Sequence, residues 1–252
     1  AHVFMSQCGE QRMEEMRALL DRISNSGIEV PQPVRKAMCD LHLEQFTTYD
    51  FDGFFHDRPV VFMETENGGV KTISAPHMIV TLLHHLELKE GHEVLVVGSK
   101  GGYIAALIAT IVGEQGRVIV IDPSEEIIRH TANALNGWPT INLRHVESID
   151  VAPIELPGDL SRILITGSVL SVPTWMEERI VEGGFVIAPI GDHHHQELMK
   201  SERQFDALHP TSLGPVSFGP VDIVESEPQP LTALEIADLI ETLIETCHEM
   251  DL

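Results

Sequence analysis

The chain has few basic residues. Its 252 residues include 16 lysines and arginines against 39 aspartates and glutamates, a formal net charge of −23, and only five of the basic residues are lysines. A surface of this charge repels phosphate groups, so we expect no nucleic-acid binding and no binding to anionic membranes. A salt-adapted source, a host with acidic proteins or an acidic docking surface would each account for the excess of acid.

Cysteines are also scarce, and no long apolar run is present. Cys8, Cys39 and Cys247 are odd in number and far apart, which is typical of a reducing cytoplasm and gives neither a disulfide framework nor a zinc-binding spacing. The longest apolar run, residues 104–112, falls short of the roughly 18 residues of a membrane span. No basic stretch followed by an apolar one stands at the N-terminus, so no signal peptide is expected.

The apolar residues, 43% of the chain, are enough for a large core and follow an α/β pattern. Helical spacing is expected over residues 10–24, 34–43, 76–86, 103–112, 124–135 and 173–181. Short buried strands are expected over residues 93–98, 117–122, 141–146, 162–166 and 185–190. Residues 46–70 are expected to be irregular. Strands that alternate with helices predict a parallel sheet with right-handed crossovers.

The strongest local signal is a glycine-rich turn between a strand and a helix, in residues 94–103. Glycines there let the backbone approach a ligand, and the start of the helix presents free N–H groups. Asp122 ends the next strand, 24 residues after Gly98. A carboxylate there accepts ribose hydroxyls, which favours a nucleoside cofactor over a merely structural turn. The GxxxxGK[ST] spacing of a phosphate-binding loop is absent.

Several strings of residues resemble one family. Lys71-Thr-Ile-Ser-Ala-Pro-His-Met78 precedes Val97-Gly-Ser-Lys-Gly-Gly-Tyr-Ile-Ala-Ala-Leu107, and further matching strings lie at 113–118, 181–191 and 214–218. They are similar to the protein-L-isoaspartate O-methyltransferase family over roughly residues 12–225. The resemblance implies a Rossmann-like class I methyltransferase, with a mostly parallel twisted sheet flanked by helices and an antiparallel strand near its end. It also implies methyl transfer from S-adenosylmethionine to the carboxylate of an isoaspartyl residue in a protein or peptide, a protein-repair reaction.

The expected organisation has three parts. Residues 1–70 form an N-terminal helical cap and substrate-side loop, residues 71–225 the methyltransferase domain, and residues 226–252 an acidic C-terminal helix. This helix begins at a capping box, Thr232–Glu235, and carries the apolar stripe Ile236, Ile240, Leu243 and Cys247. Docking on its own domain is the simpler role of this stripe. An oligomer or partner contact formed through the helix is the alternative.

The implied reaction needs few catalytic side chains. A carboxylate is already ionised at pH 7, so no general base is needed. Alignment within roughly 3–3.5 Å and exclusion of water suffice. Ser74 matches the family's active-site serine and would orient the acceptor oxygen. Its place before Ala75-Pro76 suits a helix cap equally well.

Positive groups are expected at the mouth of the site, because a carboxylate substrate is repelled by so acidic a surface. Arg58, Lys71 and Lys100 are the candidates. Arg58 belongs to Asp57-Arg58-Pro59, which resembles the family's loop over the substrate and would otherwise be a surface turn. His77 is a further candidate for substrate contact, with a first-turn helix residue as the alternative.

The resemblance assigns cofactor binding to five residues of the turn and the next strand: Gly98, Ser99, Lys100, Gly102 and Asp122. Glu147 and Asp150 stand near the position where the family has a Gly-Asp-Gly that reaches the adenine amine. Here that stretch is Glu147-Ser148-Ile149, with Asp150 displaced.

Other cofactor contacts are altered as well. Val96 replaces a usual acid that helps to hold the methionine end, and Lys100 replaces the middle glycine of G-x-G-x-G. Thr166-Gly167-Ser168 stands where the family has Thr-Ala-Ala. The Lys100 ammonium would either pair with the methionine carboxylate or fill its pocket.

Two classes of function follow. One is an S-adenosylmethionine-dependent protein carboxyl O-methyltransferase of the isoaspartyl type in the cytoplasm, or one acting on another acceptor such as an aspartate in a modified peptide. The other is a catalytically degenerate relative that works as a binding or regulatory module. The run His193–His195 is read as a solvated turn, and no metal is expected, because no carboxylate or cysteine pattern supports a metal site.

Overall fold

A computed structural model describes residues 2–153, 155–157, 159–192 and 194–221, with the backbone alone for residues 2–9. Residues Ala1–Asp222 belong to one compact unit. The acidic helix expected at 226–252 lies outside the described residues, and so does His193. No helix in the described part is long and apolar enough to cross a membrane.

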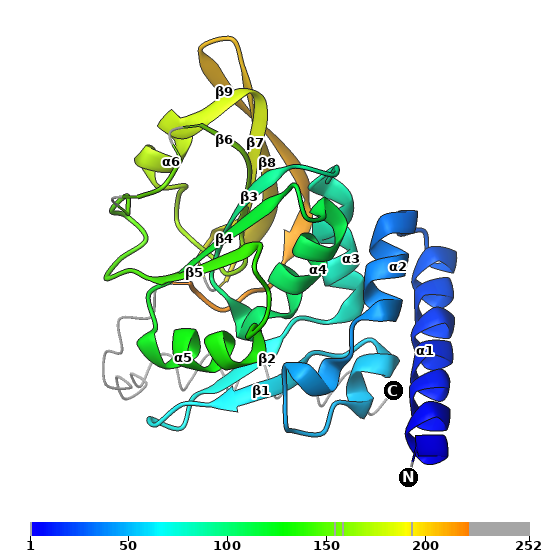
Figure 1. Ribbon diagram of the computed structural model, residues 1–252. Helices are drawn as coiled ribbons and strands as arrows, with labels where there is room; N and C mark the ends of the chain where they lie inside the picture. The colour runs from blue at the N-terminus through cyan, green and yellow to red at the C-terminus, as the bar shows by residue number, and fades with distance from the viewer. Residues whose placement is uncertain (1, 154, 158, 193, 222–252) are drawn as a thin grey trace, which may run out of the picture. The chain divides into compact units, whose positions relative to one another are not determined.

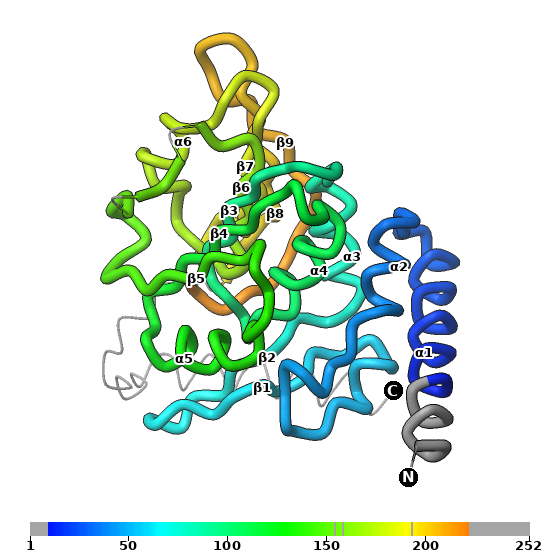
Figure 2. Tube along the Cα trace, viewed as in Figure 1, coloured from blue at the N-terminus to red at the C-terminus, as the bar shows by residue number. Residues whose placement is uncertain are grey.

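The unit is built on a seven-stranded sheet in the order β5-β4-β3-β6-β7-β8-β9 (Figure 1). The strands are β3 (Glu93–Val97), β4 (Arg117–Asp122), β5 (Ile141–His145), β6 (Leu160–Ile165), β7 (Ile180–Gly191), β8 (Gln196–Gln204) and β9 (Ala207–Val216). The strands from β5 to β7 pair in parallel, whereas β8 and β9 are antiparallel. Figure 2 traces this last part as one meander. The predicted parallel sheet and its antiparallel end are confirmed.

Helices flank the sheet where the sequence predicts them. They are α1 (His2–Asn25), α2 (Gln32–Asp40), α3 (Pro76–His85), α4 (Tyr103–Val112), α5 (Glu125–Ala134) and α6 (Thr174–Arg179). Because α4 is apolar on nearly every side, it is buried between the sheet and α2. Helix α5 follows Ser124, whose hydroxyl accepts a hydrogen bond from the Ile127 N–H at 3.3 Å and so caps the helix.

The prediction of irregular structure over 46–70 is wrong. This region contains the antiparallel hairpin β1 (Val60–Glu64) and β2 (Val70–Ile73), preceded by the short 3-10 helices η1 (Leu43–Gln45) and η2 (Asp52–His56). Residues 60–63 are all apolar and the register shifts between Val61 and Met63, so β1 lacks the alternation of apolar and polar residues that marks a half-buried strand. Helix α2 also ends at Asp40 rather than 43, because Leu41 is extended.

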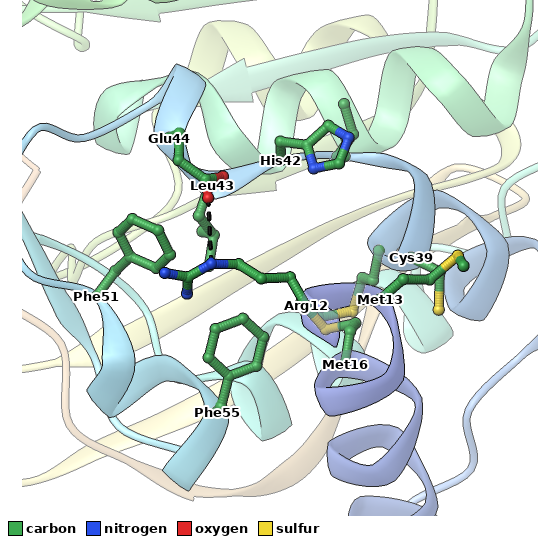
Figure 3. A pocket seen from close by; sticks show the side chains of 11 residues that line it. Arg12, Met13, Met16, Cys39, His42, Leu43, Glu44, Phe51 and Phe55 are labelled. Carbon is green, nitrogen blue, oxygen red and sulfur yellow. Dashed lines mark ion pairs between the residues drawn. The ribbon is translucent and has the colours of Figure 1, made fainter. Parts of the chain in front are cut away.

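Arg12 fastens α1 to the segment before the hairpin. Its guanidinium carbon lies 4.4 Å from the centroid of the Phe51 ring and 5.6 Å from that of Phe55. It also pairs with Glu44 at 3.3 Å and with Asp52 at 3.5 Å. Figure 3 shows the Arg12 side chain reaching past both rings to Glu44. These contacts fix η2, and with it the loop that follows, against α1.

The order of strands reverses between β3 and β6, and open α/β sheets bind ligands at the carboxyl ends of the strands at such a point. Thr166 lies there and is only 2% exposed. Its hydroxyl donates to the carbonyl oxygens of Gly98, at 2.7 Å, and Val97, at 3.1 Å. The start of the glycine turn is therefore tied to the strand on the other side of the reversal.

Replacing Thr166 by valine is expected to lower the free energy of unfolding by about 1–3 kcal/mol, because a buried carbonyl loses its donor while side-chain volume hardly changes. Urea denaturation measures the loss. Thr166→Ser keeps the hydroxyl and is the matched control. Equal stability of the valine variant and the wild type would show that this bond does not hold the turn.

Candidate functional site

Asp122 ends β4 with a side chain that is almost fully buried, at 4% exposure. One carboxylate oxygen, Oδ2, accepts from the Ser99 N–H at 2.7 Å and from the Ser99 hydroxyl at 3.0 Å. The other, Oδ1, accepts from the Ser124 N–H at 2.9 Å. Burial raises the pKa of Asp122, and the bonds from Ser99 and Ser124 and the charge of Lys71 oppose that rise.

These bonds limit what Asp122 can still accept. Each carboxylate oxygen has two lone pairs, so Oδ2 is saturated and Oδ1 keeps one free position. The Ser99 hydroxyl also lies 3.0 Å from the Thr131 hydroxyl. If Ser99 donates to Thr131 instead, a second position opens on Asp122. Two ribose hydroxyls therefore fit once that single proton is redirected.

The glycine turn joins β3 to α4 through the 3-10 segment η3 (Lys100–Gly102). Gly98, Gly101 and Gly102 have φ angles of 90°, 73° and 92°, which side chains rarely adopt. A Cβ on Gly98 would also lie 2.4 Å from the Thr166 hydroxyl oxygen, and one on Gly101 would lie 2.8 Å from the ring of Phe62. Packing alone thus requires glycine at positions 98 and 101. The contact with Phe62 also shows that β1 lies directly against the turn.

Lys100 is the exception within this turn. It has a φ of 46° although it is not a glycine, a conformation that costs roughly 1–2 kcal/mol. Its half-buried ammonium lies 5.6 Å from the centroid of the Phe218 ring and forms no ion pair with the described residues. The pKa of Lys100 is lowered by burial first and by Lys71 second, while Asp122 raises it. The fold therefore carries a strained, poorly solvated cation at this position.

Ser74 directly follows β2, which lies against η3. Its side chain is half-buried, and the hydroxyl makes no hydrogen bond within the described part of the chain. Ala75 is the N-cap of α3, with no side-chain cap bond, so the helix-capping alternative for Ser74 is not realised. The backbone N–H of His77 bonds instead to Asp57, at 2.8 Å from Oδ1. Sequence reasoning gave Asp57 no role of its own.

Lys71 and Arg58, which were predicted to contact the substrate, lie on the hairpin and in the loop before it. Lys71 pairs across the hairpin with Met63, and its charge acts on the pKa of both Lys100 and Asp122. Arg58 is exposed beside Asp57, in a groove with residues of α1.

Glu147 and Asp150 lie in the loop after β5. Glu147 lines a pocket of about 800 Å³ there, next to β4, because the N–H of Val146 bonds to the Asp122 carbonyl at 3.1 Å. Asp150 is exposed and does not line that pocket; its N–H bonds to the Ser148 hydroxyl. Glu147, and not Asp150, therefore lines this pocket; both residues are exposed, and neither Asp122 nor the glycine turn is part of the lining.

A segment after β9 returns to the carboxyl ends of the strands, which the sequence did not indicate. The Ser168 N–H donates to the Gly219 carbonyl at 2.9 Å, and Val221 packs beside Gly98 and Gly167. The side chain of Gln196 bonds both the N–H and the carbonyl of Phe218, at 2.7 and 3.0 Å. Phe218 is thereby held over Lys100. The only signal for this was the family-like string at 214–218.

Of the histidine run, His194 and His195 lie in an exposed turn. The backbone N–H groups of His194 and His195 donate to the Asp192 carboxylate, at 2.9 and 3.0 Å. No group of three or more histidine, cysteine, aspartate or glutamate side chains that could hold a metal ion occurs within residues 2–221, wherever the structure describes them.

Comparison with known proteins identifies a family. The sequence model described as Protein-L-isoaspartate(D-aspartate) O-methyltransferase (PCMT) matches residues 14–225. A protein-L-isoaspartate O-methyltransferase of Methanopyrus kandleri is 32% identical over 75% of this chain and 82% of its own length. One of Methanococcus aeolicus is 29% identical over 83% of this chain and 94% of its own.

Solved structures agree on the fold. A protein-L-isoaspartate O-methyltransferase aligns with a TM-score of 0.73 at 22% identity, over 82% of this chain and 66% of its own. A putative one from Plasmodium falciparum, solved with S-adenosyl-L-homocysteine, aligns with a TM-score of 0.69 at 21% identity, over 81% of this chain and 97% of its own. The predicted Rossmann-like fold is confirmed. The predicted reaction class and the cofactor S-adenosylmethionine are confirmed as those of the family. This chain belongs to the protein-L-isoaspartate O-methyltransferase family.

Proposed function

We propose that this chain is an active enzyme of its family, which binds S-adenosylmethionine at the glycine turn and methylates an isoaspartyl carboxylate beside Ser74. The observation that carries the proposal is the free, half-buried hydroxyl of Ser74, held by a hairpin that packs on the turn. A polar group in that position that bonds to none of the residues described by the structure is suited to a ligand.

The residues at the turn fit the cofactor. Gly98 and Gly102 let the backbone approach it, with Ser99 between them. Asp122 has a free acceptor position for a ribose hydroxyl and gains a second when Ser99 turns to Thr131. The cofactor supplies a methyl group on a sulfonium, which is electrophilic without further activation.

Two contacts at the ends of the cofactor complete the assignment. Val96 is fully buried and apolar, so it cannot replace the family's acid at the methionine end. The unpaired ammonium of Lys100 is the charged group that we assign to the methionine carboxylate. Glu147, in the pocket after β5, is assigned to the adenine amine, with the exposed Asp150 as the alternative.

The chain's own residues then have simple tasks. Ser74 donates its hydroxyl proton to one oxygen of the acceptor carboxylate and so aims the other. Arg58 and Lys71 offset the repulsion between an anionic substrate and the acidic surface. Phe218 and Val221 cover the carboxyl ends of the strands and exclude water. No general base is required, because the attacking carboxylate is already ionised.

A degenerate binding module is the second candidate. Two observations favour it: Lys100 packs under Phe218, and Oδ2 of Asp122 is saturated by Ser99. In that case the lysine side chain fills the methionine pocket. A third candidate, methylation of an aspartate in a modified peptide, would use the same residues and differ only in substrate.

The cellular setting stays a proposal as well. We place the reaction in the cytoplasm, because three widely spaced cysteines suit a reducing compartment and Cys39 is a free thiol. The substrate would be a damaged protein or peptide. An oligomer formed through residues 226–252 and the lack of nucleic-acid binding stay predictions.

Calorimetric titration with S-adenosylhomocysteine separates the first two candidates. The wild type is expected to bind, and Lys100→Gly to bind about 10- to 100-fold more weakly, because a charge-assisted hydrogen bond worth roughly 1.5–3 kcal/mol is lost. Lys89→Gly, on the exposed surface, is the control. No heat with the wild type at millimolar ligand, together with binding by Lys100→Gly, would instead establish the degenerate module.

Ser74→Ala is expected to lower kcat for an isoaspartyl peptide by about 10- to 100-fold, because one hydrogen bond to a charged oxygen is lost. Methanol release from the methylated peptide measures turnover. The melting temperature should not change, since Ser74 caps nothing. Ser74→Thr retains the hydroxyl and should retain most of the activity. A variant with normal turnover and lowered stability would return Ser74 to a structural role.

A further inference from the structure

Asp57 makes a long-range contact that the proposed reaction has not yet used. It follows η2 with a left-handed φ of 59° and caps α3 across 20 residues of sequence. The same carboxylate engages the imidazole of His77: both of its oxygens lie 3.0 Å from Nδ1. One side chain therefore fixes both the start of α3 and the orientation of the His77 ring.

The pairing determines which nitrogen of His77 remains available. A carboxylate can only accept hydrogen bonds, so Nδ1 carries a proton and donates it to Asp57. Nε2 makes no hydrogen bond with any residue that the structure describes, and the His77 side chain is 40% exposed. Nε2 therefore accepts a hydrogen bond when the ring is neutral and donates one when the ring is charged.

His77 lies close to the proposed acceptor site. It is the second residue of α3, three residues after Ser74, and the N-terminus of a helix favours an anion. An anionic ligand at Ser74 would meet Nε2 favourably only in the protonated ring, because a neutral ring presents a lone pair there.

We propose that His77 binds the substrate carboxylate as an imidazolium, donating through Nδ1 to Asp57 and through Nε2 to the carboxylate oxygen that does not attack the methyl group. His77 is then a substrate-binding residue, and Asp57 is a positioning residue that acts through it. This inference rests on the proposed function, since it concerns the same acceptor site.

The consequence is a linkage between substrate and proton. A ring that is neutral before the substrate binds must take up a proton at Nε2 to donate a hydrogen bond to the carboxylate. During transfer an O–CH3 bond forms, the S–CH3 bond breaks, and the sulfonium becomes a neutral thioether. The product ester carries no charge, so the imidazolium loses its second anionic partner. The proton returns to solvent as the ester leaves.

Other charged groups surround this pair. Glu15 and Arg22 of α1 line one groove together with His56, Asp57 and Arg58, and Lys71 lies on the hairpin before Ser74. Arg22 is held by the Phe55 carbonyl, at 2.5 Å. Arg58 is exposed. Within this set Asp57 alone bonds to the imidazole, so it fixes Nδ1 as the nitrogen that carries the proton in the neutral ring.

The test measures proton uptake directly. An isoaspartyl hexapeptide is titrated into the enzyme saturated with S-adenosylhomocysteine, in buffers of different ionisation enthalpy at one pH. We expect uptake of up to one proton with the wild type and a KM for methylation that rises with pH as the imidazolium is lost. With His77→Gln the uptake should vanish, and KM should be higher and independent of pH. The same peptide with ordinary aspartate controls for non-specific binding.

Two further variants separate positioning from folding. Asp57→Asn keeps an oxygen to cap α3 and tolerates the left-handed φ, but it removes the charge that favours the imidazolium. It should raise KM about tenfold and reduce proton uptake, with kcat and the melting temperature nearly unchanged. His209→Gln, on the exposed face of β9, is the matched control and should behave as the wild type.

The outcomes are distinct. Binding and methylation of the peptide without proton uptake, and with a KM that does not depend on pH, would overturn the role of His77 and leave the proposed function intact. Loss of stability in Asp57→Asn with unchanged pH dependence would reduce Asp57 to a helix cap. Neither binding nor methylation by the wild type would contradict the proposed function and this inference with it.

Discussion

The buried charge of Asp122 constrains the whole carboxyl edge of the sheet. A carboxylate out of water is costly unless hydrogen bonds compensate, and here the compensation comes from Ser99 and Ser124. The Ser99 N–H belongs to the glycine turn, and the Ser124 N–H to the start of α5. Satisfying a single side chain therefore fixes both loops that flank the proposed cofactor site. The chain's own hydrogen bonds hold these loops in place, and the Ser99 proton is the part that must move when a ribose binds.

The small number of cations is the second constraint on the site. A chain with a net charge of −23 has few basic residues that could bind an anionic substrate. The charge of Lys71 lowers the pKa of Lys100, and the two residues lie on segments that pack together, β2 and η3. The left-handed backbone and partial burial of Lys100 both cost stability. A conditional charge on His77, present when a carboxylate binds, would add a third cation without a permanent cost.

Much of the fold could be predicted from the sequence because local composition decides it. The apolar runs of β3 and β4 and the apolar helix α4 are buried on all sides, so their pattern needs no knowledge of distant partners. The hairpin could not be predicted in this way, since the apolar run at residues 60–63 has no alternation, and periodicity alone cannot tell such a run from a helix segment. The turn and Asp122 were found because strand, glycines and acid follow one another in order.

The substrate side was less accessible to sequence reasoning. Ser74 precedes a proline-started helix, and that spacing alone suggests a cap. Only the structure shows that Asp57 takes over the cap and leaves the hydroxyl free. Likewise the chain turns back toward the glycine turn after β9 and brings Phe218 to Lys100. No local sequence pattern predicts this contact.

In the proposed enzyme Lys100 holds the cofactor rather than replacing it, which a crystal structure with S-adenosylhomocysteine would show. We expect the nucleoside against Asp122, the Ser99 hydroxyl turned to Thr131, and the Lys100 ammonium about 2.7–2.9 Å from the homocysteine carboxylate. Density for the lysine side chain in the methionine pocket, with no nucleoside at saturating ligand, would contradict it.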